Sequence, residues 1–331
     1  MKHEKLLGNL FAFALLFMLL IHCSKNNTNL PTSKWAQWRG HNRDGKSGET
    51  GLLKQWPPGG PRLLWSIEGI GVGYSSVAVS NNIIYTTGKI DSLDYLTAID
   101  RNGKMKWQMP YGLACRQSFS ESRCTPTVEG NRIYMISGQG EIVCIDAENA
   151  KKLWSIDAFN KFEGKYGRWE VAESPLLVNE KVIYTPGGDK TTIVALDKNT
   201  GKTVWISESL HDFTAYVAPL LIQYGGKKII VNVTANYLFG VDAVDGKMLW
   251  QVKYSDIERP QGHPDAPIIN ANTPLFHDGQ IFVTSGYDHV GAMFKLSEEA
   301  SEISFVWSDS TLDTHVGGVV HVDGYIYGSN W

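Results

Sequence analysis

The stretch ALDKNTGKTVW, from Ala195 to Trp205, recurs in altered form at three other places in the chain. It contains an apolar pair ending at Asp197, then Gly201, and then Trp205, eight residues after the Asp. The Asp and Trp of the other copies are Asp100 with Trp107, Asp146 with Trp154, and Asp242 with Trp250. A motif that returns about every 40–50 residues indicates a chain built from copies of one supersecondary unit.

Each copy contains sequence for four strands. The first strand commonly follows a Pro, as Leu176-Leu177 follows Pro175, and the second contains a pair such as Ile183-Tyr184. The third strand ends at the Asp and the fourth at the Trp, and their β-branched content supports strands. We expect the Asp to accept from backbone amides in an Asx-type turn and the Trp to pack between units, so both series are predicted to be structural.

Four strands in each repeat predict an all-β fold, a β-propeller of four-stranded blades over residues 35–331. Five blades are expected to be complete, the fifth ending at Trp307 without the Asp. Leu63-Leu64-Trp65 predicts a lone N-terminal strand that closes the last blade. Residues 316–327 supply at most two strands of a sixth blade, so we expect an incomplete ring and a C-terminally truncated fragment of a longer propeller.

Composition excludes two classes of protein. The 331 residues are 43% hydrophobic with a formal net charge of −3, which argues against a disordered chain and against a basic nucleic-acid binder. We therefore expect no nucleic-acid partner.

The N-terminus predicts export. Lys2 and Lys5 precede twelve apolar residues, 10–21, which are too few to span a bilayer but suit a signal peptide. Cys23 follows, and residues 24–34 are a polar tether. This arrangement resembles a bacterial lipoprotein signal, although His22 stands where a small residue is usual; the alternative is an ordinary cleaved signal peptide. The resemblance implies that residues 1–23 are the signal, that Cys23 is lipidated, and that the protein is periplasmic or anchored at the outer membrane.

Three further cysteines, Cys115, Cys124 and Cys144, allow at most one disulfide, and the sequence leaves open whether Cys115 and Cys124 pair. Cys144 lies in a predicted strand, 141–146, where a buried inert thiol is expected. Their spacing predicts no metal site.

The repeat as a whole resembles that of pyrroloquinoline-quinone (PQQ)-type propellers. That superfamily includes the quinoprotein alcohol dehydrogenases and the outer-membrane assembly factor BamB. A narrower resemblance is to exported PQQ-like repeat proteins, most of them without an established activity. It rests on Trp35 to Gly40 with Asn42 to Gly45, and on Gly71 to Ser76, Ala172 to Pro175, Thr185 to Gly188, Ala271 to Pro274 and His315 to Gly318.

Two functions are compatible with this resemblance. The first, which we favour, is a membrane-tethered, non-enzymatic scaffold that binds a protein or polymer and needs no cofactor. The alternative is a dehydrogenase of alcohols or sugars that uses PQQ and calcium, although the adjacent Cys-Cys pair of the well-studied alcohol dehydrogenases is missing. No catalytic residue is predicted. Candidate ligand-binding residues at the channel mouth lie just before first strands, at Arg123, Glu173, His211 and His315. The insert 255–270 is a candidate partner-facing loop.

Overall fold

The computed structural model describes residues 35–117, 119–257, 269–287 and 289–330. The predicted signal peptide, Cys23 and the tether lie outside these residues, as does most of the insert 255–270. No helix in the described part of the chain is long and apolar enough to cross a membrane.

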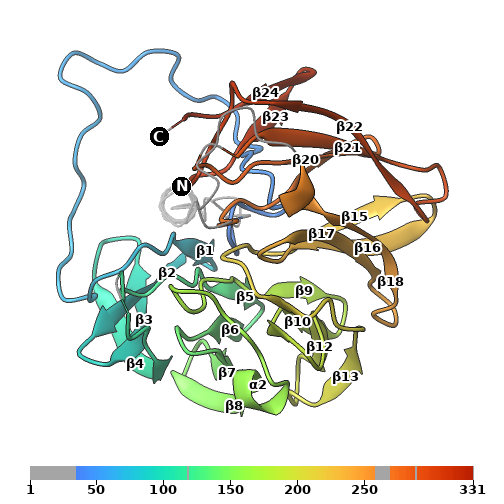
Figure 1. Cartoon of the computed structure of the whole chain (residues 1–331). Coiled ribbons are helices and arrows are strands. Elements are labelled where there is room, and N and C mark those ends of the chain that lie inside the picture. The colour runs from blue at the N-terminus through green and yellow to red at the C-terminus, as the bar shows by residue number, and fades with distance from the viewer. Residues whose placement is uncertain (1–34, 118, 258–268, 288, 331) are drawn as a thin grey trace, which may run out of the picture. The chain divides into compact units, whose positions relative to one another are not determined.

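Five four-stranded antiparallel sheets follow one another around a common centre (Figure 1). Blade 1 contains β1 (Ala78–Ser80), β2 (Ile83–Ile90), β3 (Leu93–Asp100) and β4 (Met105–Leu113). Blade 2 contains β5 (Thr127–Glu129), β6 (Arg132–Ile136), β7 (Glu141–Asp146) and β8 (Lys151–Asp157), followed by the short helix α2 (Ala158–Lys161). Blade 3 contains β9 (Leu176–Val178), β10 (Lys181–Tyr184), β12 (Val194–Asp197) and β13 (Thr203–Ile206).

Blade 4 contains β15 (Leu220–Tyr224), β16 (Lys227–Val233), β17 (Tyr237–Asp242) and β18 (Met248–Lys253), which leads into the 3-10 turn η1 (Tyr254–Asp256). Blade 5 contains β19 (Leu275–His277), β20 (Gln280–Val283), β21 (Gly291–Leu296) and β22 (Ile303–Asp309). Two pairs complete the list: β23 (Val320–Val322) with β24 (Tyr325–Tyr327), and β11 (Gly187–Gly188) with β14 (Asp212–Phe213). The prediction of five complete blades and a partial sixth is confirmed.

One detail differs from the sequence prediction. Residues 63–65 form no strand, and Leu63 and Leu64 are exposed. An outermost strand pairs with the third strand of its blade, and the sixth sheet has only β23 and β24 among the described residues. Trp65 instead docks on blade 1, where its Nε1 donates to the Arg101 carbonyl at 2.8 Å.

The repeat residues hold neighbouring blades together. Like Trp65, Trp107 and Trp154 donate Nε1 to the carbonyl after the Asp of the next blade, at 3.2 and 3.0 Å. Trp154 also lies against Gly201, where a Cβ would come within 2.8 Å of the ring. The Gly of the repeat therefore leaves room for the tryptophan of the preceding blade.

The Asp of the repeat closes the turn between the third and fourth strands. Each Oδ1 accepts the amide two residues on, with donors Asn102 (2.9 Å), Glu148 (2.9 Å), Asn199 (3.1 Å) and Val244 (2.8 Å). These four carboxylates are turn components, and their bonds explain why the Asp recurs.

Candidate functional site

Residues 35–45, which we call the hub segment, lie at the centre of the sheets (Figure 1). The Trp35 carbonyl accepts the amide of Val79 in blade 1, and the Ala36 carbonyl accepts that of Val128 in blade 2, both at 2.8 Å. The hub segment therefore joins first strands that are about 50 residues apart in the sequence.

Arg43 is the most engaged side chain of the hub segment. It is 2% exposed, and its Nη1 donates to the Ser174 carbonyl at 3.1 Å and to the Pro219 carbonyl at 3.0 Å, while Nη2 donates to Pro175. Burial lowers the pKa of Arg43 to about 10, so the guanidinium stays charged at neutral pH. One cation thus links blades 3 and 4 through their main-chain carbonyls.

Arg39 extends these links to the sixth sheet. Its Nη2 donates to the Val319 carbonyl at 2.5 Å, and its guanidinium occupies the space in front of Gly318, which has no side chain. The hub segment therefore contacts five of the six sheets of the propeller, counting the two-stranded one.

Glu173 is fully buried beside Arg43. Its Oε2 accepts the Thr185 amide at 3.1 Å, whereas Oε1 has no hydrogen-bond partner. Burial raises the pKa of Glu173 to about 8, against the opposing effects of the Thr185 hydrogen bonds and of Arg43. Because the carboxyl has no access to solvent, it is a component of the channel interior and not of an open mouth.

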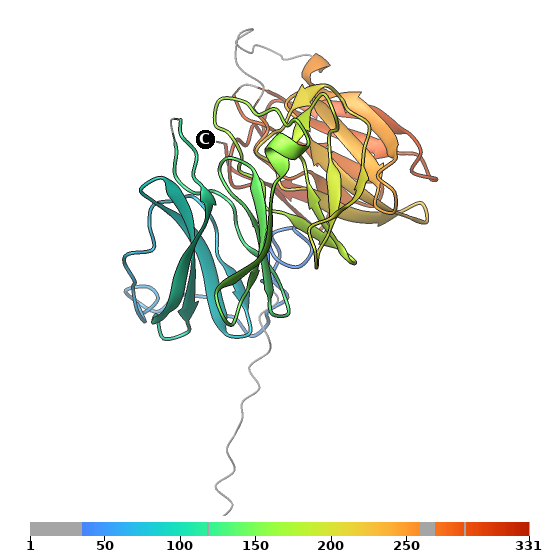
Figure 2. The ribbon, with the colours of Figure 1, turned by 90° about the horizontal axis from the view of Figure 1, so that it is seen from below.

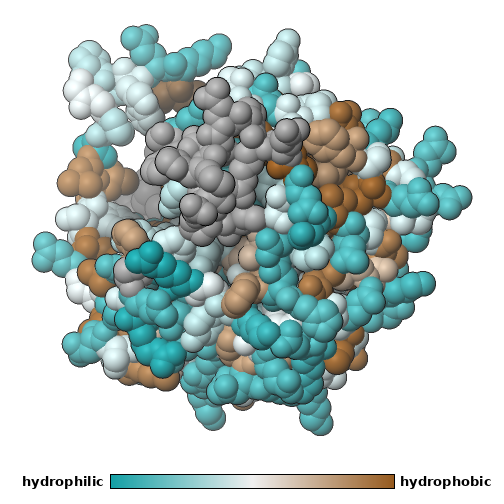
Figure 3. All heavy atoms as spheres, in the orientation of Figure 1, coloured by the Kyte–Doolittle hydropathy of each residue, from teal (hydrophilic) through white to brown (hydrophobic). Residues whose placement is uncertain are grey.

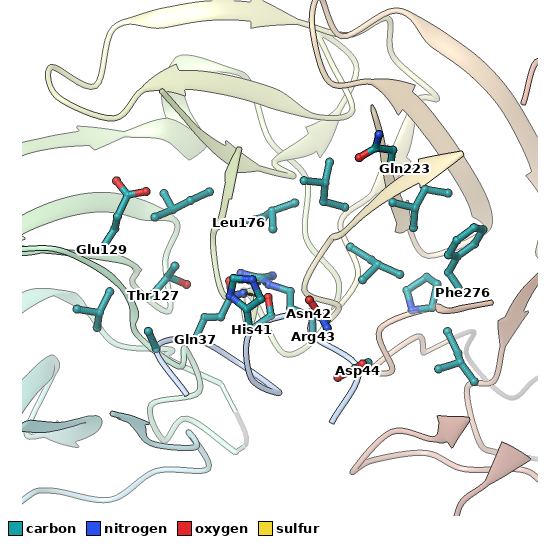
Figure 4. Close-up of a pocket in the computed structure, with 18 residues that line it drawn as sticks. Gln37, His41, Asn42, Arg43, Asp44, Thr127, Glu129, Leu176, Gln223 and Phe276 are labelled. Carbon is teal, nitrogen blue, oxygen red and sulfur yellow. Dashed lines mark hydrogen bonds between the residues drawn. The ribbon is translucent and has the colours of Figure 1, made fainter. Parts of the chain in front are cut away.

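A pocket of about 770 Å³ surrounds the hub segment (Figure 4). Gln37, His41 and Asp44 of the hub segment lie in the middle of that view, and the first strands surround them with mainly apolar side chains. Thr127, Glu129, Leu176, Gln223 and Phe276 are among these strand residues.

The motifs of the narrower resemblance gather around this hub. The Ser76 amide donates to Thr125 Oγ1 at 3.0 Å, and the Thr125 amide donates to Ser174 Oγ at 2.9 Å, so hydroxyls before the first strands link blades 1, 2 and 3. Asn272 accepts the Gly318 amide at 3.0 Å. The sequence reveals these motifs but not their common purpose, although several of them share a position before first strands.

The opposite end of the channel carries the mouth cluster, which we define as Arg116, Arg123, Tyr166, Arg168, Trp169 and Tyr216. These residues lie in the connections that lead from the fourth strand of one blade to the first strand of the next. Figures 1 and 3 view this side, where hydrophilic and apolar residues are interspersed.

Aromatic rings and arginines contact one another in the mouth cluster. Tyr216 OH accepts the Trp169 amide at 3.1 Å, the two rings are 5.8 Å apart edge to face, and Arg168 lies 5.7 Å from the Trp169 ring. Arg116 donates to Tyr166 OH at 3.2 Å and pairs with buried Glu170 at 3.3 Å, yet its side chain is 66% exposed.

The four candidate mouth residues occupy four different environments. Arg123 donates to the Trp169 carbonyl and contacts Cys115 Sγ at 3.4 Å. Glu173 is buried, as described. His211 is exposed and lies 3.5 Å from Asp189, and the His315 ring lies edge-on against Tyr287 at 4.4 Å. Of these residues, Arg123 is the one that joins the mouth cluster.

The three described cysteines are buried free thiols. Burial raises the pKa of Cys115 to about 11, of Cys124 to about 12 and of Cys144 to about 11. Their thiolate forms are therefore scarce at neutral pH, and they are poor nucleophiles.

Within the described ranges, no three His, Cys, Asp or Glu side chains are grouped as a metal site. Calcium prefers several oxygen ligands with carboxylates among them. Glu173, a buried carboxyl near the hub, lies beside the Arg43 cation.

Comparisons with known proteins agree with this fold. The family model PQQ_2, described as "Outer membrane protein assembly factor BamB", matches residues 92–331. The chain belongs to this family. BamB of Kangiella koreensis is 26% identical over 222 residues, which are 65% of this chain and 49% of that protein. The quinohemoprotein alcohol dehydrogenase ADH-IIG of Pseudomonas putida is 26% identical over 155 residues, 43% of this chain and 21% of that protein.

Among solved structures, BamB from Moraxella catarrhalis superposes with a TM-score of 0.51 and 18% identity, over 78% of this chain and 69% of that one. This likeness shows the fold of the family member described here. The chain spans about half the length of the curated BamB relatives it matches.

Proposed function

We propose that this member of the BamB family is a non-enzymatic scaffold in outer-membrane protein assembly. It is exported, tethered to a membrane through a lipid on Cys23, and binds a protein partner at the mouth cluster. The observation that carries the proposal is the mouth cluster itself, where exposed arginines are fixed beside aromatic rings.

Tryptophan, tyrosine and arginine dominate the binding energy of protein interfaces. Contacts within the mouth cluster already order Trp169 and Tyr216, so a partner would not have to immobilise them on binding. The exposed guanidiniums of Arg116 and Arg168 favour a partner segment that carries carboxylates beside apolar side chains.

The same proposal includes no quinone cofactor. Arg43 and Glu173 form the polar interior of the hub, where the Arg43 guanidinium donates to main-chain carbonyls that precede the first strands of blades 3 and 4. The competing function is PQQ-dependent dehydrogenation, which the similarity to a quinohemoprotein alcohol dehydrogenase suggests. A titration with PQQ and Ca²⁺ tests this alternative directly.

The experiment is site-specific photo-crosslinking in cells of a Gram-negative host that expresses the full chain. A photoreactive amino acid replaces Arg168 at the mouth cluster or, as the matched control, Lys202, an exposed residue of an Asp turn. We expect a discrete crosslink to an outer-membrane assembly protein from position 168 and none from position 202. Equal crosslinks from both positions, or dye reduction that depends on PQQ and Ca²⁺, would contradict the proposal.

A further inference from the structure

The two ends of the channel are chemically different faces of the propeller. In an antiparallel sheet the first and third strands run in the same direction. The turns after the first strands and the Asp turns therefore share one face, which we call the Asp-turn face. The mouth cluster, α2 and the other connections between blades lie on the opposite face, which is at the top in Figure 2.

The chain enters the propeller at the Asp-turn face. Val79 is the second-last residue of β1 and Val128 the second-last residue of β5, so both lie close to that face. Their amides bind the carbonyls of Trp35 and Ala36. The first described residue is therefore held at the inner edge of the blades, on the side of the Asp turns.

The reach of the tether limits how the propeller can lie on a membrane. Twelve peptide units separate Cys23 from Trp35. A flexible chain of that length has an r.m.s. span of about 19 Å and reaches about 40 Å only when fully extended. Passing around a blade requires at least about 35 Å, because the chain must cross four strands spaced about 4.8 Å apart and then a strand length of about 23 Å, as for the seven residues of β8.

We propose that the Asp-turn face lies against the membrane and that the mouth cluster points away from it. This inference rests on the proposed lipid at Cys23. The favoured short span of the tether brings the Asp turns to the lipid surface, whereas the inverted orientation requires near-complete extension and its loss of chain entropy. A partner then meets the mouth cluster from the aqueous side.

The Asp-turn face has the polarity of a surface that rests beside lipid headgroups. One lysine follows the Asp turn of each of blades 1 to 4, and all four are exposed: Lys104, Lys151, Lys202 and Lys247. The four Asp carboxylates of these turns, together with Glu148 and Asp245, offset this positive charge. The tether, and not anionic lipid, therefore sets the orientation, which should not depend on the fraction of anionic lipid.

The test uses the lipidated full chain in vesicles of phosphatidylethanolamine that carry a headgroup nitroxide, with and without phosphatidylglycerol. A fluorophore is attached at Asn102→Cys on the Asp-turn face or at Arg168→Cys at the mouth, both exposed positions. The native thiols Cys115, Cys124 and Cys144 are buried and compete little for the label. We expect at least about threefold stronger quenching at position 102, with or without phosphatidylglycerol.

A second variant separates the tether from other causes. Inserting about 30 Gly and Ser residues after Asn29 relaxes the length limit, so quenching at the two positions should become similar. Equal or reversed quenching with the natural tether would overturn the orientation while leaving the lipid anchor intact. Failure of the lipidated chain to float with vesicles would overturn the anchor, and the orientation with it.

Discussion

Arg43 in the hub segment and Arg116 in the mouth cluster have opposite roles. Arg43 in the hub is 2% exposed, and its guanidinium donates hydrogen bonds to the carbonyls of Ser174, Pro175 and Pro219. Arg116 at the mouth has a side chain that is 66% exposed and is held by one carboxylate and one phenol. The hub end is thus built to hold the sheets together, and the mouth end is built to present charge.

The largest expected effect is on the free energy of unfolding, and it distinguishes the hub from the mouth cluster. Arg43→Met should lower the free energy of unfolding by about 3–5 kcal/mol, because three buried carbonyls and Glu173 lose their cation. Denaturant unfolding followed by tryptophan fluorescence measures the change. Arg168→Met is the matched control and should stay within about 0.5 kcal/mol of the wild type.

The second effect is a dependence of stability on pH. The pKa of Glu173 is raised in the folded state to about 8, so the folded protein binds a proton that the unfolded chain releases above about pH 4.5. Its contribution is fully present below pH 4.5 and is lost progressively as the pH rises to about 8. In Glu173→Gln, the fall in stability between pH 5 and pH 8 should be smaller than in the wild type by on the order of a few kcal/mol. Identical pH profiles for the two proteins would show that Glu173 is ionised throughout.

A smaller effect is expected at the mouth. Arg116→Ala removes the Nε–Glu170 pair but leaves the Arg116 backbone amide, which donates to Glu170 Oε2 at 2.6 Å. We expect a loss far smaller than that of Arg43→Met, because the cation is largely in solvent. Thermal unfolding at low and high salt checks this, since the loss should shrink in high salt. A loss as large as that of Arg43→Met would abolish the contrast between the two ends.

The smallest effect on stability is expected for Arg168→Glu, about 0.5 kcal/mol or less, because Arg168 is exposed and lies over one ring. Partner crosslinking from a neighbouring mouth position, for example Tyr166, should nevertheless fall at least about tenfold, as expected for a charge reversal at an interface. Retained crosslinking with this variant would place the partner elsewhere.

The periodic part of the molecule could be predicted from the sequence, and the site could not. Asp197, Gly201 and Trp205 each do a local or nearest-neighbour task that recurs in most blades, so their spacing reveals it. Arg43 acts once, on carbonyls 131 to 176 residues away, and carbonyls leave no signature in a sequence.

The same limit explains why the strand predicted at Leu63–Trp65 does not form. It also explains why, of the four candidate mouth residues, Arg123 is the one that belongs to the mouth cluster. The Trp65 side chain makes the same kind of hydrogen bond as Trp107 and Trp154, although its backbone pairs with no strand among the described residues. Glu173 precedes a first strand like Arg123, yet it is buried and lies beside Arg43, which stands 130 positions earlier in the chain. Tyr166 and Trp169 lie in a connection outside the repeat, and only their aromatic density could have drawn attention to them.

The most direct test of the scaffold function compares two charge reversals on opposite faces in cells that depend on the full protein. Arg168→Glu alters the mouth cluster, and Arg101→Glu alters an Asp turn at a position that is also exposed. The amount of assembled outer-membrane protein is measured in both. We predict that it falls with Arg168→Glu and stays at the wild-type level with Arg101→Glu. Wild-type assembly in both variants, or an equal loss in both, would contradict a scaffold that works through its mouth.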